Sequence, residues 1–165
     1  MEIKTLSLIP QIEVAVGKLL KDITTKDLLK VTALYHNLIG LDNSVSPIKT
    51  SDLLLFKNLK TLGFSNSMFY SEDLLNISML KNLTKLSFYN CEIHAEGKIL
   101  NSLQHIEYLD ITQSQFNSFE FIKNFKSLKT LQIDKKIFES KRDFFTRLKN
   151  ELKIELISQT KDEGD

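Results

Sequence analysis

The stretch LTKLSFYNCEI, residues 83–93, spaces its apolar side chains in a way that suits neither a helix nor a simple strand. Leu83, Leu86, Phe88 and Ile93 are the apolar positions, and Cys91 lies between the last two. Side chains alternate across a strand, so Leu86 and Phe88 point to one face. The wider gap that follows marks a change of chain direction. The stretch therefore predicts a short strand that runs into a corner.

The same pattern, LxxLxLxx(N/C)xL, recurs along the chain. It appears as LKTLGFSNSMF at 59–69, IEYLDITQSQF at 106–116 and LKTLQIDKKIF at 128–138, and in looser form as VTALYHNLIGL at 31–41. The copies start at residues 31, 59, 83, 106 and 128, so they follow one another at 28, 24, 23 and 22 residues. Repeats of this length bury their apolar residues only by stacking on their neighbours.

On these residues, from about 28 to 138, the chain resembles the leucine-rich repeat family, in particular the short repeats of bacterial internalins. The resemblance implies an α/β fold: a right-handed solenoid with a concave parallel β-sheet, short and partly 3₁₀ helices on the convex side, and helical caps at both ends. It also implies that the corner residues Ser67, Cys91 and Ser114 satisfy backbone groups of the turn. Lys136 takes this position in the last copy and indicates that the repeats end there.

We expect one domain over residues 1–158 and a flexible tail over 159–165. PQIEVAVGKLLKD predicts an N-terminal cap helix over 10–22, and ESKRDFFTRLKNEL followed by KIELIS predicts a C-terminal cap of a helix and a last strand over 139–157. The inward residues of the two cap helices are expected to be Ile12, Val16, Leu19, Leu20, Phe144, Phe145, Leu148 and Leu152.

Composition and charge restrict the class of partner. The chain has 165 residues, of which 42% are apolar and 26% charged, as in an ordinary globular domain. Lys plus Arg is 22 against 21 Asp plus Glu, so no overall field favours nucleic acid or an anionic membrane. A single cysteine excludes an internal disulfide, and the N-terminus makes a poor secretory signal. We expect a cytoplasmic protein that is monomeric on its own.

The sequence offers little material for catalysis. Cys91 is the one candidate nucleophile, but its position in the repeated pattern points its side chain inward. This favours a structural role over a catalytic role for the thiol. His36, His94 and His105 do not have the spacing of metal ligands, and no glycine-rich phosphate-binding motif occurs. We therefore expect no metal, no cofactor and no enzymatic activity.

The outward strand positions are the remaining candidates. Columns taken across the copies gather three of the four tyrosines with polar side chains of both charges. The candidate binding residues are Tyr35, Asn37, Lys85, Tyr89, Asn90, Tyr108, Asp110, Thr112, Gln113, Gln132, Asp134 and Lys135, with Lys85, Tyr89, Tyr108 and Asp110 at the centre. The mixture of charges argues against a nucleic-acid groove. A polar outward face and good strand-forming tyrosines are also what an ordinary sheet surface shows.

The family resemblance implies non-catalytic binding of another protein through the concave face, with an inhibitor or immunity-type adaptor as one form of it. The alternative is a structural subunit or scaffold that docks on a larger assembly through its convex side or an end.

Overall fold

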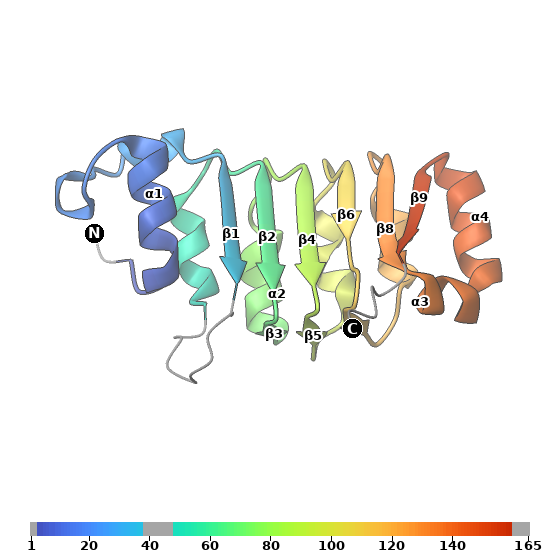
Figure 1. Cartoon of the computed structure of the whole chain (residues 1–165). Coiled ribbons are helices and arrows are strands. Elements are labelled where there is room, and N and C mark those ends of the chain that lie inside the picture. The colour runs from blue at the N-terminus through green and yellow to red at the C-terminus, as the bar shows by residue number, and fades with distance from the viewer. Residues whose placement is uncertain (1–2, 38–47, 160–165) are drawn as a thin grey trace.

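The computed structural model describes residues 3–37 and 48–159, and its centre is a six-stranded parallel sheet (Figure 1). Neighbouring strands follow the order β1-β2-β4-β6-β8-β9. Their bounds are β1 Ala33–Asn37, β2 Thr61–Ser65, β4 Lys85–Tyr89, β6 Tyr108–Asp110, β8 Thr130–Asp134 and β9 Glu155–Gln159. A parallel sheet combined with helices is the α/β class that the sequence predicts.

The register of the sheet matches the repeated sequence pattern position by position. Leu62 on β2 lies opposite Leu34 on β1 and Leu86 on β4, and the column continues through Leu109 to Leu131. All five leucine side chains are buried. Side chains alternate along a strand, so the third, fifth and seventh positions of each copy of the pattern lie on the other side of the sheet. In the copy that starts at residue 83, these are Lys85, Ser87 and Tyr89. We call that side the open face.

A second parallel sheet forms where the chain turns the corner. It consists of β3 (Met68–Phe69), β5 (Glu92–Ile93) and β7 (Gln115–Phe116). The corner residues bond the backbone, as the family resemblance implies: the Ser114 hydroxyl donates to the Phe88 carbonyl at 2.7 Å and accepts from the Cys91 N–H at 2.8 Å. The Cys91 thiol donates to the Tyr89 carbonyl at 3.3 Å, and Ser67 makes the corresponding bond one turn earlier.

Phenylalanine rings fill the space between the two sheets. The Phe88 ring centroid lies 5.6 Å from that of Phe64, 5.2 Å from Phe69 and 5.9 Å from Phe116. Phe116 continues the contact to Phe121 at 5.3 Å. Each such ring pair contributes about 0.5–1.5 kcal/mol beyond the burial of its area, so the rings add to the cohesion between successive turns.

Short helices cover the side of the sheet opposite the open face, behind the strands in Figure 1. They are the 3₁₀ helices η4 (Thr50–Leu55), η5 (Gly97–Ser102) and η6 (Glu120–Asn124) and the α-helix α2 (Ser71–Ser78). Their inward side chains, among them Leu53, Leu74, Ile77, Leu100 and Ile122, are buried. The prediction of short, partly 3₁₀ segments is confirmed. Of the helices in the described ranges, none has the length and apolar character to cross a membrane.

The N-terminal helix is shorter than expected. After η1 (Leu6–Leu8), α1 runs over Ile9–Val16 and ends at Gly17, whose φ of 72° is left-handed. Glycine adopts this conformation without strain and commonly ends a helix. Ile12 and Val16 are buried as predicted, but Leu19 lies past the end of the helix and is 59% exposed. The predicted inward position of Leu19, and a helix over 10–22, are therefore wrong.

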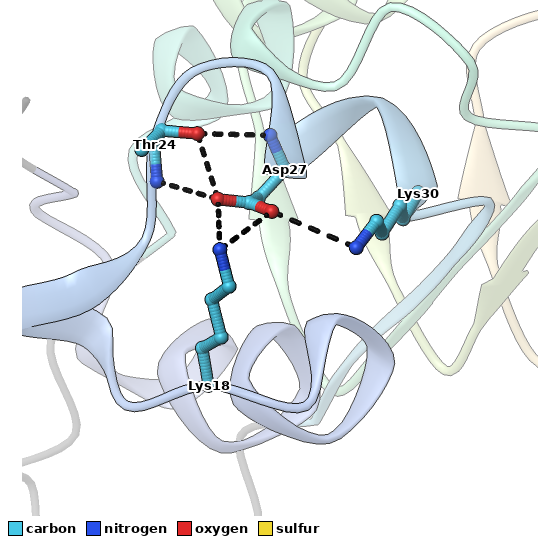
Figure 2. Close-up of polar contacts among 4 residues, drawn as sticks. All are labelled: Lys18, Thr24, Asp27 and Lys30. Atoms are coloured by element: carbon cyan, nitrogen blue, oxygen red, sulfur yellow. Dashed lines mark hydrogen bonds and ion pairs between the residues drawn. The ribbon is translucent and has the colours of Figure 1, made fainter.

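Asp27 holds the loop that follows α1 (Figure 2). Its carboxylate accepts hydrogen bonds from the Thr24 hydroxyl at 2.7 Å and the Thr24 N–H at 3.0 Å, and from Lys18 Nζ at 3.0 Å. Lys30 Nζ lies 3.6 Å from its other oxygen. These hydrogen bonds, those from Thr24 first, lower the pKa of Asp27 well below its ordinary value. The cluster joins η2 (Leu20–Asp22) to η3 (Asp27–Lys30), which leads into β1.

Two side chains fasten the N-terminal segment to the rest of the fold, Gln11 to strand β1 and Asp52 of η4 to the first residues. The Gln11 amide oxygen accepts from the Tyr35 N–H at 2.8 Å, and its NH₂ group donates to the Tyr35 carbonyl, so one side chain pairs the free edge of β1. Asp52 accepts from the backbone N–H groups of Lys4 at 2.8 Å and Thr5 at 2.7 Å. The outer backbone groups of Tyr35 are therefore unavailable for pairing with a further strand.

At the C-terminal end the last copy of the pattern departs from the others. Helix α3 (Lys135–Ser140) starts where a corner was expected, so Lys136 lies in a helix. Helix α4 (Arg142–Leu152) follows, with Phe145 and Leu148 buried and Phe144 and Leu152 partly buried, as predicted. The chain then forms β9 on the far side of β8, which confirms the last strand. The expected flexible tail beyond residue 159, and Ile39 and Leu41 of the first copy, lie outside the described residues.

His36 is the one histidine in the core. It takes an inward position on β1 and is 1% exposed. Its Nδ1 lies 2.9 Å from the Ser7 hydroxyl, whereas its Nε2 has no hydrogen-bond partner among the residues that the structure describes. Burial lowers the pKa of His36 below its ordinary 6.5.

Replacement of Leu86 by alanine tests the inward column. The side chain is fully buried, so Leu86→Ala is expected to lower the free energy of unfolding by about 2–5 kcal/mol. Leu75→Ala, the same change on the exposed side of α2, is the matched control and should stay within about 0.5 kcal/mol. Urea unfolding followed by circular dichroism gives both values. Equal effects would show that Leu86 is not in the core.

Acid is expected to destabilise the protein through His36. The unfolded chain takes up a proton at His36 near pH 6.5, while the folded protein does so only at lower pH. The contribution of His36 to the free energy of unfolding is therefore fully present above about pH 6.5 and is lost as the pH falls below it. Urea unfolding at about pH 7.5 and pH 5 should show this loss in the native protein and in His94→Gln, whose histidine is exposed. A profile for His36→Phe as steep as that of the native protein would contradict it.

Candidate interaction face

The candidate binding residues separate into three groups according to exposure. Five are exposed on the open face or at its lower border in Figure 1: Tyr35, Asn37, Lys85, Tyr89 and Asn90. Four are partly exposed there: Tyr108, Gln113, Gln132 and Asp134. The remaining three depart from the prediction in burial or in position: Asp110, Thr112 and Lys135.

Two of the three tyrosines of the open face, Tyr35 and Tyr108, are supported in different ways. Tyr35 is 58% exposed and its ring covers Gly63, where an added Cβ would come within 2.6 Å of the ring. The Tyr108 hydroxyl donates to the Gln132 amide oxygen at 2.8 Å, on the neighbouring strand. Burial, and secondarily the nearby Asp110 carboxylate, raise the pKa of Tyr108. Tyr108 is therefore held in place as a neutral ring.

A shallow hollow of about 290 Å³ lies between Tyr35 and Tyr108 on the open face. Thr61, Lys85 and Ser87 line it together with the two rings. Tyr35 is on β1, Thr61 on β2, Lys85 and Ser87 on β4 and Tyr108 on β6, so four neighbouring strands contribute to the hollow. It presents aromatic surface, hydroxyl groups and one ammonium group.

Asp110 lies on the open face but is buried, which corrects its predicted accessibility. One carboxylate oxygen accepts from the Ser87 hydroxyl at 3.0 Å and the other from the Thr112 N–H at 2.9 Å. Both oxygens are used inside the protein. Strand β6 ends at Asp110, so Thr112 already belongs to the turn and is 2% exposed, not outward as predicted. These two residues position the face and do not present groups to a partner.

Lys135 also departs from the prediction. It was expected as the last outward residue of a turn, but it is the first residue of α3. Its side chain is exposed, yet it belongs to a helix rather than to a strand or corner. The following sequence, KKIFES, has no glycine, asparagine or serine at the corner position, and the backbone continues as a helix instead.

A row of side-chain amides borders the open face where the strands end. Asn90 donates to the Asn66 amide oxygen at 2.6 Å, and Asn66 donates to that of Asn37 at 3.0 Å. Gln113 donates to the Tyr89 hydroxyl at 3.0 Å. We call Asn37, Asn66, Asn90 and Gln113 the amide row. Asn66, Asn90 and Gln113 have φ of 55°, 51° and 58°, a conformation that asparagine tolerates better than most residues.

The amide row was only partly predicted. The pattern places Asn66, Asn90 and Gln113 outward, but Asn66 was not among the candidate binding residues, and neither the bonds between the amides nor their left-handed backbone was expected. The signal was available, because asparagine, asparagine and glutamine follow one another at the same frame position. Left-handed residues at a fixed offset are a sign of a repeated turn.

Cys91 does not have the environment of a nucleophile. Its side chain is 1% exposed, and burial raises the pKa of its thiol to about 11. A thiol at neutral pH, inaccessible to substrate, cannot attack a carbonyl or a disulfide. In the part of the chain that the structure describes, no three His, Cys, Asp or Glu side chains gather as metal ligands would. Cys91 therefore acts as a structural residue of the corner, bonded to the Tyr89 carbonyl.

Comparison with protein-family models and with curated proteins finds no match. Among solved structures, the chain is similar to an internalin C2 from Listeria monocytogenes, at 19% sequence identity and a TM-score of 0.44. The similarity covers 80% of this chain and 75% of the internalin chain. A likeness at this level does not establish a family or a function for the chain.

The thiol of Cys91 is expected to be inert in the folded protein. Ellman's reagent should label it only after unfolding, because the thiol is buried and un-ionised at neutral pH. The comparison is between native protein and protein in concentrated urea, with Ser67→Cys as a second buried thiol and Ser118→Cys as an exposed one. Rapid labelling of native Cys91, at the rate of the exposed control, would reopen the enzymatic hypothesis.

Proposed function

We propose that the chain is a non-catalytic module that binds another protein through the open face of its six-stranded sheet. The observation that carries the proposal is the pair of tyrosines, Tyr89 and Tyr108, whose hydroxyls are bonded within the face while part of each side chain stays accessible. Rings held in one position lose little conformational entropy on binding, and tyrosine is enriched where binding energy concentrates.

The proposal includes the finer description of the fold. The turns stack as a right-handed leucine-rich repeat solenoid, the open face is its concave side, and α1 and α4 are its caps within one domain. The in-register leucine column and the bonded corner residues support this description. The twelve candidate residues, without Asp110, Thr112 and Lys135, are the proposed contact set.

An inhibitor or immunity-type adaptor is one form of this function. A preorganised face that covers part of a partner blocks what that part does, without any chemistry of its own. The anchored tyrosines, with the amide row as a polar border, resemble the aromatic centre and polar rim of protein interfaces.

The second candidate function is that of a structural subunit that docks through its helical side. Leu75 and Met79 project from α2 and its C-terminus, and they are 54% and 59% exposed. Residues four apart lie on the same side of a helix, so the two side chains form a small apolar site. This surface is separate from the open face, and the two candidates can be tested side by side.

Replacement of the two tyrosines tests the open face. The double change Tyr89→Ala and Tyr108→Ala should weaken recovery of a partner from the source cells at least tenfold, since each central anchor contributes about 1–2 kcal/mol or more. The matched control is Leu75→Ser with Met79→Ser on the helical side, which should leave the recovery unchanged. Loss of the partner with the control and not with the tyrosine variant would favour the structural subunit.

A further inference from the structure

Four lysines gather at the edge of the sheet where the strands begin, the upper edge in Figure 1. Lys57 and Lys60 lie in the segment that leads into β2, and Lys81 and Lys85 lie in the corresponding segment and first residue of β4. All four side chains are exposed. We call these four residues the lysine patch. It borders the hollow of the open face, which Lys85 lines.

Backbone hydrogen bonds hold the two segments of the patch together. The N–H groups of Thr84 and Lys85 both donate to the Lys60 carbonyl at 2.9 Å, and the Asn82 side chain donates to the Lys57 carbonyl at 2.8 Å. Neighbouring strands of a sheet lie about 4.8 Å apart, so the two segments carry their lysines side by side. An anionic surface above them can contact lysines of both segments.

Some lysines at this edge have acidic partners, whereas those of the patch, like Lys126 before β8, have none among the described residues. Lys30 is paired with Asp27 (Figure 2), and Lys129 Nζ lies 2.9 Å from a carboxylate oxygen of Glu107. Over residues 3–37 and 48–159, no ion pair involves a patch lysine. Lys81 Nζ donates to the Ser78 carbonyl at 2.8 Å, which holds the ammonium group without neutralising it.

The opposite edge of the sheet, where the strands end, carries acidic groups. Glu72 and Asp73 stand in the first turn of α2, Glu92 is in β5, and Asp134 is the last residue of β8. Lys135 and Lys136 follow Asp134, so a ligand that lies across the open face meets cations at one edge and charges of both signs at the other. A nucleic acid carries one sign of charge throughout and would be repelled by these carboxylates. A protein surface can carry both signs.

We infer that the lysine patch binds an acidic side of the partner protein. The partner then lies across the open face with carboxylates above Lys57, Lys60, Lys81 and Lys85 and with neutral or basic residues above the edge where the strands end. This orientation rests on the proposed function of the open face. The affinity of the patch for carboxylates depends on the four lysines alone, and can be measured without the partner.

A labelled octaglutamate peptide is the probe for the patch, with fluorescence anisotropy as the readout at about 20 mM NaCl. The triple change Lys57→Gln, Lys60→Gln and Lys81→Gln should lower its affinity about tenfold, and about 300 mM NaCl should abolish binding. The control with the same loss of charge combines Lys98→Gln, Lys135→Gln and Lys136→Gln, whose side chains are also exposed but lie outside the patch. The control is expected to bind like the native protein.

Three results would overturn the inference: no binding of octaglutamate at low salt, an equal loss of affinity in the control, or tighter binding of a single-stranded DNA oligonucleotide of the same charge. The last result would assign the patch to nucleic acid. The double tyrosine variant should bind octaglutamate like the native protein, because its lysines are unchanged. Failure of the tyrosine face and failure of the lysine patch are therefore separate results.

Discussion

No single turn of this chain can bury its own apolar residues, and the rest of the structure depends on this constraint. Each turn supplies a leucine to a column from Leu34 to Leu131, and each leucine is covered by its equivalents in the neighbouring turns. A shift of one residue would turn the whole column toward solvent, so burial fixes the register of the sheet. Between the two sheets, Phe64, Phe88 and Phe116 add ring contacts of the same kind from turn to turn.

The same register that buries the leucines arranges the open face. Equivalent positions of successive turns come to lie side by side, so a chemical group that recurs in the sequence becomes a row in space. Asparagines at the corner make the amide row, and lysines before the strands make the lysine patch. A surface of this kind needs no loops of its own, since the stacked backbone positions its side chains.

Much of this arrangement could be predicted from sequence, because the apolar spacing reports burial directly. The strands follow from the repeated pattern, and the corner bonds of Ser67, Cys91 and Ser114 are what the family resemblance implies. The 3₁₀ segments and the last strand are predicted by the stretches between and after the copies. The polar details do not follow, since they depend on which neighbour lies within reach. Asp110 is buried because Ser87 on the next strand and Thr112 in the turn both donate to it. The lysine patch does not follow from the outward positions of the repeated pattern, the third to the eighth, because three of its lysines precede the third position.

The stacking of the leucine column is the central claim, and methyl-resolved NMR tests it most directly. With leucine methyl groups labelled, nuclear Overhauser contacts should run in sequence from Leu62 to Leu86, Leu109 and Leu131, each of which is buried next to its register partners. None of these methyl groups should exchange magnetisation with water. Contacts that skip a turn, or methyl groups of Leu86 and Leu109 that lie in solvent, would contradict the stacked arrangement and the face built on it.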